Sequence, residues 1–295
     1  VTAMAAPVRV SANTQPIQSK NTTVKKETTN VAKSGYTFVS APASEPVVEN
    51  NIVTVTHVNG EKTRITFLEN NLFRLDMEPD GKDEDFKEYA TPNNPEHTGR
   101  IVQQNDASSE YSKPTPTIKN EVGVYTISVQ DGVSLEVSKE DSTMTLKRAD
   151  GSIVWQEAKP VQYKKGSTVQ TFVKNAGENF FGGGTQNGRF IHTGESINIK
   201  NENNWVSGGV ASPNPFYWST NGYGVVRNTF KQGVYDFGKT NNNEVEATHS
   251  EKRLDAYYFV GDTPVSVLQG YFKLTGNPAL FPEEAFYLGH LNCYN

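Results

Sequence analysis

The sequence contains one cysteine, Cys293, so no disulfide can form within the chain. No apolar run approaches the ~18 residues that a membrane-spanning helix needs. The chain has a formal net charge of -5 and no dense stripe of lysine and arginine. These absences exclude a disulfide-stapled fold, and we expect no membrane span and no nucleic-acid partner.

Motifs for metals and nucleotides are missing as well. The five histidines are scattered and show no metal-ligand spacing, and the acidic cluster in residues 80–85 lacks the calcium-loop pattern. No Lys-Ser/Thr pair follows Gly182-Gly183-Gly184, which argues against a phosphate-binding loop. This glycine run instead predicts a tight turn or a close approach of the backbone to another domain. We expect no metal and no cofactor.

The first 48 residues differ in composition from the rest. Ala3-Met4-Ala5 fits the small-x-small pattern at the end of a signal peptide, although an ordinary flexible terminus is the alternative. The polar stretch that follows has too few large apolar residues to offset the entropy of ordering it. We predict a signal-peptide remnant and a disordered polar linker over residues 1–48, typical of a secreted or cell-surface bacterial protein, Gram-positive in type.

From residue 49 onward, short β-branched and aromatic segments alternate with turn residues. Asn59-Gly60 and Asp131-Gly132 each lie between two such segments, which predicts two β-hairpins. The expected strands are 52–58, 63–68, 71–77, 122–129, 133–137, 144–147, 153–155, 168–174, 195–200, 222–229 and 253–260. Strands this short and regular predict a mainly β fold, an antiparallel β-sandwich over residues 49–280.

One helix is expected near the end of the chain. Thr263 or Asp262 can cap it, Pro264 suits its first position, and Gly276 provides a stop. Its apolar positions recur at helical spacing at Val265, Leu268, Tyr271 and Phe272. Residues 286–292 then read as a further strand, which suggests the start of another domain over residues 281–295.

The segment 201–218 has the composition of a sugar site. It combines asparagines, small residues and aromatics, and amides bond to hydroxyls while aromatic faces cover the C–H faces of a sugar. Phe216, Tyr217 and Trp218 are predicted to be core. Asn204 and Trp205 lie in mid-loop and are candidates for facing a ligand, with a packed loop as the alternative.

Three segments resemble glycoside hydrolase family 31. Residues 179–186, Asn-Phe-Phe-Gly-Gly-Gly-Thr-Gln, are similar to the family's FYGLGE turn, and residues 214–225 with 235–238 resemble its PFYLSSRGYGVF…DFG stretch. Residues 254–282 are similar to YYFLTGPSPKEVLRQYTELTGRPALPP in order and spacing, which makes this the most specific of the three.

The resemblance implies a galactose-mutarotase-like β-sandwich that leads into a (β/α)8 barrel, truncated here after its first strand. It implies a retaining α-glycosidase with an aspartate nucleophile and an aspartate acid/base, about 5–5.5 Å apart. Both would lie beyond residue 295, so no catalytic residue is expected in this chain, and the segment alone should be inactive. The expected partner is an oligosaccharide or glycoconjugate.

In the family a sandwich loop reaches over the barrel mouth, and residues 201–215 match it. Active sites of such barrels lie at the carboxyl ends of the strands, which implies that residues 290–294 lie near the substrate. The substrate-binding residues predicted in this way are Asn204, Trp205, Asn214, His290, Asn292 and Tyr294.

The chain departs from the family pattern in two places. Gly-Gly-Thr-Gln stands where GLGE is usual, and His290 and Asn292 replace bulky aromatics of the first barrel strand. We therefore hypothesise a branch that accepts an α-linked N-acetylhexosamine, whose acetamido group asparagines can bind. A transglycosylase of the same family is one alternative, and a non-catalytic carbohydrate-binding or surface module is another. The oligomeric state is not predicted.

Overall fold

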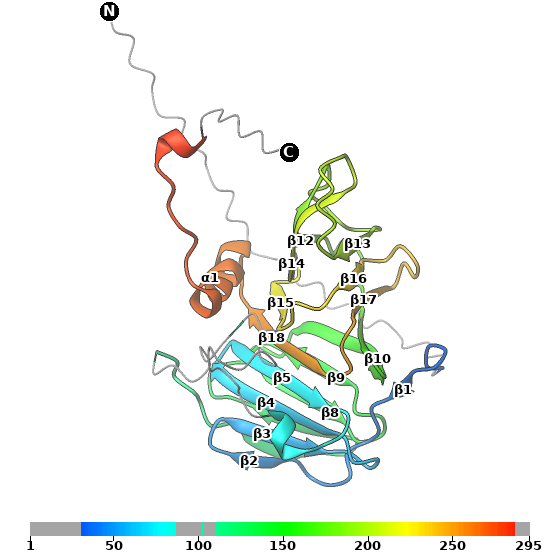
Figure 1. Ribbon diagram of the computed structural model, residues 1–295. Helices are drawn as coiled ribbons and strands as arrows, with labels where there is room; N and C mark the ends of the chain where they lie inside the picture. Colours follow the sequence, from blue (N-terminus) through cyan, green and yellow to red (C-terminus); the bar gives the residue numbers. More distant parts are fainter. Residues whose placement is uncertain (1–30, 87–101, 103–109, 287–295) are drawn as a thin grey trace, which may run out of the picture.

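The computed structural model describes residues 31–86, 102 and 110–286. In this part of the chain, two antiparallel β-sheets pack face to face and one α-helix lies beside them (Figure 1). The predicted antiparallel β-sandwich is therefore confirmed. Residues 287–295, which hold most of the strand predicted at 286–292, lie outside the described residues.

The first sheet has ten strands. They are β1 (Thr37–Phe38), β6 (Thr117–Asn120), β7 (Val124–Ser128), β8 (Ser134–Ser138), β9 (Met144–Lys147), β10 (Ile153–Lys164), β11 (Ser167–Val173), β13 (Ser196–Ile199), β16 (Gly233–Asp236) and β17 (Glu244–His249). Their order is β13-β16-β17-β11-β10-β9-β8-β7-β6, and β1 pairs with β10 beside this path.

The second sheet has eight strands. They are β2 (Val47–Glu49), β3 (Ile52–Thr56), β4 (Lys62–Glu69), β5 (Leu72–Glu78), β12 (Phe180–Gln186), β14 (Val210–Ser219), β15 (Tyr223–Arg227) and β18 (Leu254–Val260). Their order is β12-β14-β15-β18-β5-β4-β3-β2. Two short 3₁₀ helices, η1 (Asp83–Phe86) and η4 (Glu283–Phe286), complete the described elements.

Both hairpins predicted from the sequence are present. β3 pairs with β4 around Gly60, and β7 pairs with β8 around Asp131, whose φ of 52° lies in the left-handed region. Aspartate and glycine tolerate that region better than most residues, so the turn residues themselves specify these hairpins.

The core lies between the two sheets and holds many aromatic side chains. Trp155 packs on Phe172 and Tyr258, with ring centroids 4.9 and 5.4 Å apart. Nearer to β13, the interior holds the fully buried polar side chains of Tyr217, Tyr235 and others. Aromatic contacts run continuously through the interior from Trp155 to Tyr235, with tyrosine hydroxyls among the apolar side chains.

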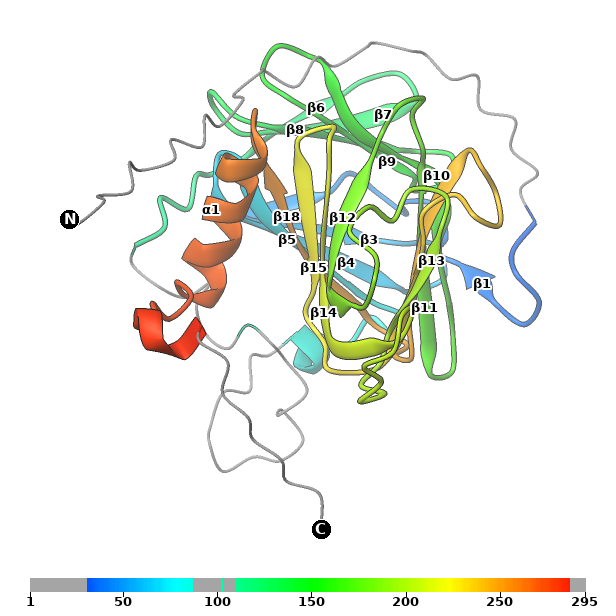
Figure 2. The ribbon, with the colours of Figure 1, turned by 90° about the horizontal axis from the view of Figure 1, so that it is seen from above.

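The helix α1 (Pro264–Thr275) forms as predicted and covers the outer face of the eight-stranded sheet (Figure 2). Thr263 caps it in a capping box with Ser266, and Gly276 follows its last turn. Its buried residues are Val267 and Leu274. The predicted apolar stripe was wrong at one end, because Val265 is 57% exposed.

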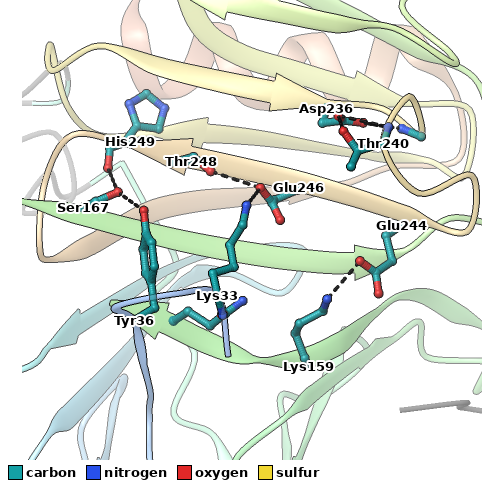
Figure 3. Close-up of polar contacts among 12 residues, drawn as sticks. Lys33, Tyr36, Lys159, Ser167, Asp236, Thr240, Glu244, Glu246, Thr248 and His249 are labelled. Carbon is teal, nitrogen blue, oxygen red and sulfur yellow. Dashed lines mark hydrogen bonds and ion pairs between the residues drawn. The ribbon is translucent and has the colours of Figure 1, made fainter. Parts of the chain in front are cut away.

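The predicted disordered linker is wrong for residues 33–48, which carry β1 and the start of β2. Two tethers fasten this segment to the ten-stranded sheet (Figure 3). Lys33 forms an ion pair with Glu246 of β17, and the Tyr36 hydroxyl lies 2.8 Å from Ser167 Oγ of β11. Val39 is buried in the core. Composition averaged over 48 residues hid these few anchoring side chains.

The glycine run forms part of β12, and the predicted tight turn is wrong. The alternative, a close backbone approach, holds within the sandwich and involves β14. A Cβ at Gly182 would lie 2.5 Å from the carbonyl oxygen of Phe216, and one at Gly184 would lie 2.2 Å from that of Ser212. With φ values of 111° and 75°, both positions require glycine.

No helix in the described part of the chain is long and apolar enough to cross a membrane.

Candidate functional site

The candidate site lies at the edge of the sandwich where both sheets end. β13 is the last strand of the ten-stranded sheet and β12 is the last strand of the eight-stranded sheet. Residues 187–195 join β12 to β13, and residues 200–209 join β13 to β14, so both connections project from this edge (Figure 1). The loop predicted at 201–215 is shorter in the structure because β14 begins at Val210.

The loop of residues 200–209 is fixed by backbone and side-chain hydrogen bonds at its base. The Asn204 N–H donates to Val210 O over 3.0 Å. Asn187, on the neighbouring loop, donates from Nδ2 to Asn204 O over 2.7 Å and accepts from the Gly208 N–H over 2.7 Å. These bonds give residues 204–208 a defined conformation without burying them.

Trp205 stands at the tip of this loop and is 71% exposed. Its indole Nε1 donates to Asn203 Oδ1 over 2.9 Å, which restricts the orientation of the ring. Asn204 is half-buried, and its Oδ1 accepts from the Val206 N–H over 3.2 Å. The structure thus brings these two predicted residues together, with Trp205 facing solvent and Asn204 supporting the loop. Their contact with a sugar remains a prediction.

Asn214 lies on β14 and is engaged with the helix. Its Nδ2 donates to the Tyr271 hydroxyl over 3.0 Å, and its Oδ1 accepts from the Phe216 N–H over 3.1 Å. The Tyr271 ring also stacks on Phe216, with centroids 4.2 Å apart. Asn214 therefore helps to join α1 to the sheet, and its predicted role in substrate binding is untested.

The remaining predicted substrate-binding residues, His290, Asn292 and Tyr294, lie outside the described residues.

A groove of about 310 Å³ lies beside the loop. We call it the edge groove. It is lined by residues 199–201, 211–213 and 229–232 and by Pro215. Because Ile199 pairs with Gly233 in the β13–β16 ladder, the chain leaving β13 and the chain entering β16 lie side by side. This pairing forms one wall of the groove.

The wall behind the edge groove is built from buried polar groups. His249 Nδ1 lies 2.9 Å from the carbonyl oxygen of Lys231, and its Nε2 lies 2.9 Å from the Tyr235 hydroxyl. Burial, together with the positive charge of Arg227, lowers the pKa of His249 to about 3. His249 is therefore neutral near pH 7 and serves as a fixed hydrogen-bonding support.

An aromatic row crosses the outer side of β12 and β14. Phe181 stacks on Trp218 with ring centroids 4.3 Å apart, and Phe190 stands edge-on to Phe181 at 6.0 Å. Phe190 is 84% exposed, whereas Trp218 is half-buried. The core prediction is confirmed for Phe216 and Tyr217, which are buried, and Trp218 is only partly covered.

Sequence reasoning missed Phe190, Lys200, Phe230 and Lys231. Phe190 and Phe230 are large aromatics in otherwise polar connections, and that isolation was the available indication of an exposed role. The two lysines carry no local pattern. Only the pairing of β13 with β16 brings them to one groove.

One cluster of buried charges serves structure. Arg74 donates from Nε and Nη2 to the two carboxylate oxygens of Asp255 over 2.7 and 2.9 Å, and Asn228 bonds to the same carboxylate over 2.9 Å. Arg253 holds Asp76 in the same cluster. These carboxylates are engaged by guanidinium groups rather than directed into the edge groove. No group of residues among those described could hold a metal ion.

Sequence comparison connects this architecture to known proteins. Residues 62–236 match the glycosyl hydrolase 31 N-terminal galactose mutarotase-like domain. Over 124 residues the chain is 32% identical to an alpha-xylosidase of Emericella nidulans, a match covering 42% of this chain and 16% of that enzyme. It is 25% identical over 199 residues to a 1,6-alpha-glucosyltransferase of Sporosarcina globispora, covering 63% of this chain and 15% of that protein.

A solved structure shares this fold. The GH31 dextranase of Flavobacterium johnsoniae, solved with isomaltotriose, superposes with a TM-score of 0.71 at 18% identity, covering 82% of this chain and 29% of the dextranase. The chain thus spans less than a third of each of these three relatives. The family domain matches more than half of the chain, from β4 to β16. The chain therefore belongs to glycoside hydrolase family 31.

Proposed function

We propose that this chain is the N-terminal, substrate-recognising part of a secreted enzyme that hydrolyses α-linked glycosides. The observation that carries the proposal is Trp205, an exposed indole held at a fixed orientation on a braced loop. An indole exposed to water on a loop contributes little to the packing of the sandwich. Its aromatic face is of the kind that packs against the C–H face of a pyranose. Because the loop is already ordered by Asn187, little entropy is lost when a sugar binds there.

The family relatives support the chemistry. One relative is named an alpha-xylosidase and another a 1,6-alpha-glucosyltransferase, and the dextranase was solved with isomaltotriose. We propose that the two catalytic aspartates belong to a barrel that follows this domain, and that the sandwich loop closes one side of the substrate site. Within this class, an α-linked N-acetylhexosamine is the finer hypothesis, with Asn204 as a partner for the acetamido group.

The first test is a turnover screen of the whole enzyme of which this chain is a part. The panel consists of aryl α-glycosides of glucose, xylose, galactose, GalNAc and GlcNAc, with NMR of the anomer released. Release of the α anomer from one of them supports a retaining α-glycosidase and names its sugar. No turnover on any of them, with saccharide binding intact, would instead support a non-catalytic binding module.

The role of the loop is tested by substitution in the same enzyme. Trp205→Ala should raise KM by about tenfold with a smaller change in kcat, because stacking on one sugar contributes ~1 kcal/mol or more to binding. Trp205→Phe, which keeps an aromatic face, should recover part of the loss. Val122→Ala is the control, since Val122 is a fully exposed apolar residue beside β7. An unchanged KM in Trp205→Ala would rule out the proposed contact.

A glycosyl transferase of the same family is the second candidate, favoured by the similarity to the 1,6-alpha-glucosyltransferase. Hydrolysis and transfer differ in whether water or a sugar hydroxyl accepts the glycosyl unit. Product analysis at high oligosaccharide concentration separates them, because a transferase yields longer saccharides where a hydrolase yields only shorter ones.

A further inference from the structure

The edge groove is lined by positive charge, although the chain as a whole is negatively charged. Its lining includes two lysines, Lys200 and Lys231, and contains no aspartate or glutamate. Both lysines are exposed, and neither forms an ion pair with any residue that the structure describes. The whole chain has a net charge of -5, so a groove lined only by positive charge is a local feature.

The carboxylates of Glu195, Glu202 and Asp236 contact residues other than the two lysines of the groove. Glu202 accepts a hydrogen bond from Asn198 Nδ2 over 3.3 Å, and Glu195 lies 3.6 Å from the ammonium group of Lys239. Asp236 accepts from the backbone N–H of Lys239 over 2.7 Å and bonds to Thr240 as well (Figure 3). In the described part of the chain, none of these three carboxylates forms an ion pair with Lys200 or Lys231.

The groove is held in shape before any ligand arrives. The Lys231 N–H donates to Thr229 Oγ1 over 3.0 Å, which fixes the turn between β15 and β16. The carbonyl oxygens of Lys231 and Gln232 are bound to His249 Nδ1 and to the Ser250 N–H over 2.9 and 2.8 Å. The backbone that carries Lys231 is thus anchored on both sides, and only the side chain needs to adjust.

The remaining lining groups suit a sugar ring. Phe230 is 67% exposed and offers an aromatic face, while Asn201 and Gln232 offer amides that can both donate to and accept from hydroxyl groups. A groove of about 310 Å³ falls at the lower end of the range for small-molecule sites. Lysine binds carboxylate and sulfate groups as a compact point charge.

We propose that the edge groove binds a negatively charged sugar residue, a hexuronic acid or a sulfated hexose, within a longer saccharide. The lysine ammonium groups would contact the anionic substituent, Phe230 would cover the ring, and the amides would bond to its hydroxyls. This inference rests on the proposed function only in that a saccharide must reach this edge of the sandwich.

The test is isothermal titration of the 295-residue chain with three α-linked disaccharides that differ in one residue: glucose, glucuronic acid or glucose 6-sulfate. At low ionic strength, at least one acidic ligand should bind about tenfold or more tighter than the neutral one. Adding salt to about 0.15 M should reduce this preference, because exposed charges are screened. Preference for the uronate or for the sulfate identifies which anion the groove accepts.

The double variant Lys200→Gln/Lys231→Gln should lose the preference for the acidic ligand and keep the affinity for the neutral one. Lys119→Gln is the matched control, because Lys119 is an exposed lysine on β6, at the opposite end of the same sheet. Equal binding of all three ligands, binding of none, or a preference that survives in the double variant overturns the inference. The turnover screen decides the proposed function separately, since it depends on neither lysine.

Discussion

Tyr217 and Tyr235 provide a matched test of how hydrogen bonding governs the stability of the sandwich interior. Both rings are completely buried, and their centroids lie 5.3 Å apart. The Tyr235 hydroxyl donates to Pro215 O over 3.0 Å and lies 2.9 Å from His249 Nε2. The Tyr217 hydroxyl has no hydrogen-bond partner among the described residues. Burial raises the pKa of both phenols, so both are neutral hydroxyls.

The same substitution should therefore have opposite effects at the two sites. Tyr217→Phe removes a hydroxyl that lost its hydration without gaining a bond, and we expect the free energy of unfolding to rise by about 1 kcal/mol. The Tyr235 hydroxyl has one proton, so Tyr235→Phe leaves one buried acceptor unpaired, either Pro215 O or His249 Nε2, and we expect a loss of about 2 kcal/mol. The predicted difference between the variants is about 3 kcal/mol.

Urea unfolding of the 295-residue chain measures this difference. The midpoints should move in opposite directions while the m-value stays constant, because neither change alters the surface exposed on unfolding. A loss of about 1 kcal/mol or more in Tyr217→Phe would mean that its hydroxyl is satisfied, for instance by a buried water. Equal losses in both variants would refute the assignment of hydrogen bonds in this part of the core.

Three further predictions concern pH, backbone and helix capping. Because the folded chain lowers the pKa of His249 to about 3 from an ordinary 6.5, the unfolded chain binds a proton between these values that the native chain does not. Stability should fall by up to about 1.4 kcal/mol per pH unit as the pH drops from 6.5 toward 3, and urea midpoints at pH 7 and pH 5 should differ less in His249→Gln. Gly184→Ala should lower Tm more than Gly177→Ala. The two φ values are 75° and 76°, but only at Gly184 would a Cβ meet another atom, 2.2 Å from Ser212 O. A Tm loss of equal size in the two would contradict this. Thr263→Ala should cost about 1 kcal/mol, measured by urea unfolding, by removing the cap of α1, and Thr263→Ser should retain most of it.

The elements that the sequence predicted well are those specified by neighbouring residues. Asp131 and its following glycine set a turn geometry, and Thr263, Pro264 and Gly276 mark the two ends of α1. In each case, the physical requirement and the residue that meets it lie within a few positions of one another. Such features need no knowledge of the rest of the fold.

The elements that were missed depend on distant partners. The glycine run looks like a turn in isolation, yet it lies within β12, at an irregularity in the pairing with β14. The backbone of β14, some thirty residues later, occupies the space that side chains would need. β1 is held by its pairing with β10, and the residues before it by contacts from Lys33 and Tyr36 to strands far along the chain. Neither interaction can be predicted from the local composition.

The candidate site divides in the same way. Asn204 and Trp205 were predictable because the loop's composition is local. Asn214 shared that composition, but its amide is engaged by Tyr271 of a helix that begins fifty residues later. The edge groove is assembled only when β13 pairs with β16, which brings Lys200 close to Lys231.

The site lies at the edges of the two sheets, where backbone N–H and C=O groups are left unpaired. β12 and β13 are edge strands, and an edge presents backbone groups that can pair with any passing strand. Here the connections that leave these two strands are irregular, glycine-rich and braced by Asn187. They therefore present side chains to the solvent instead of a regular row of unpaired backbone groups. The buried core lies away from them, between the sheets. Substitutions of Trp205, Lys200 or Lys231 should therefore change what the edge binds while leaving the fold intact, and this separation makes the edge suited to recognition.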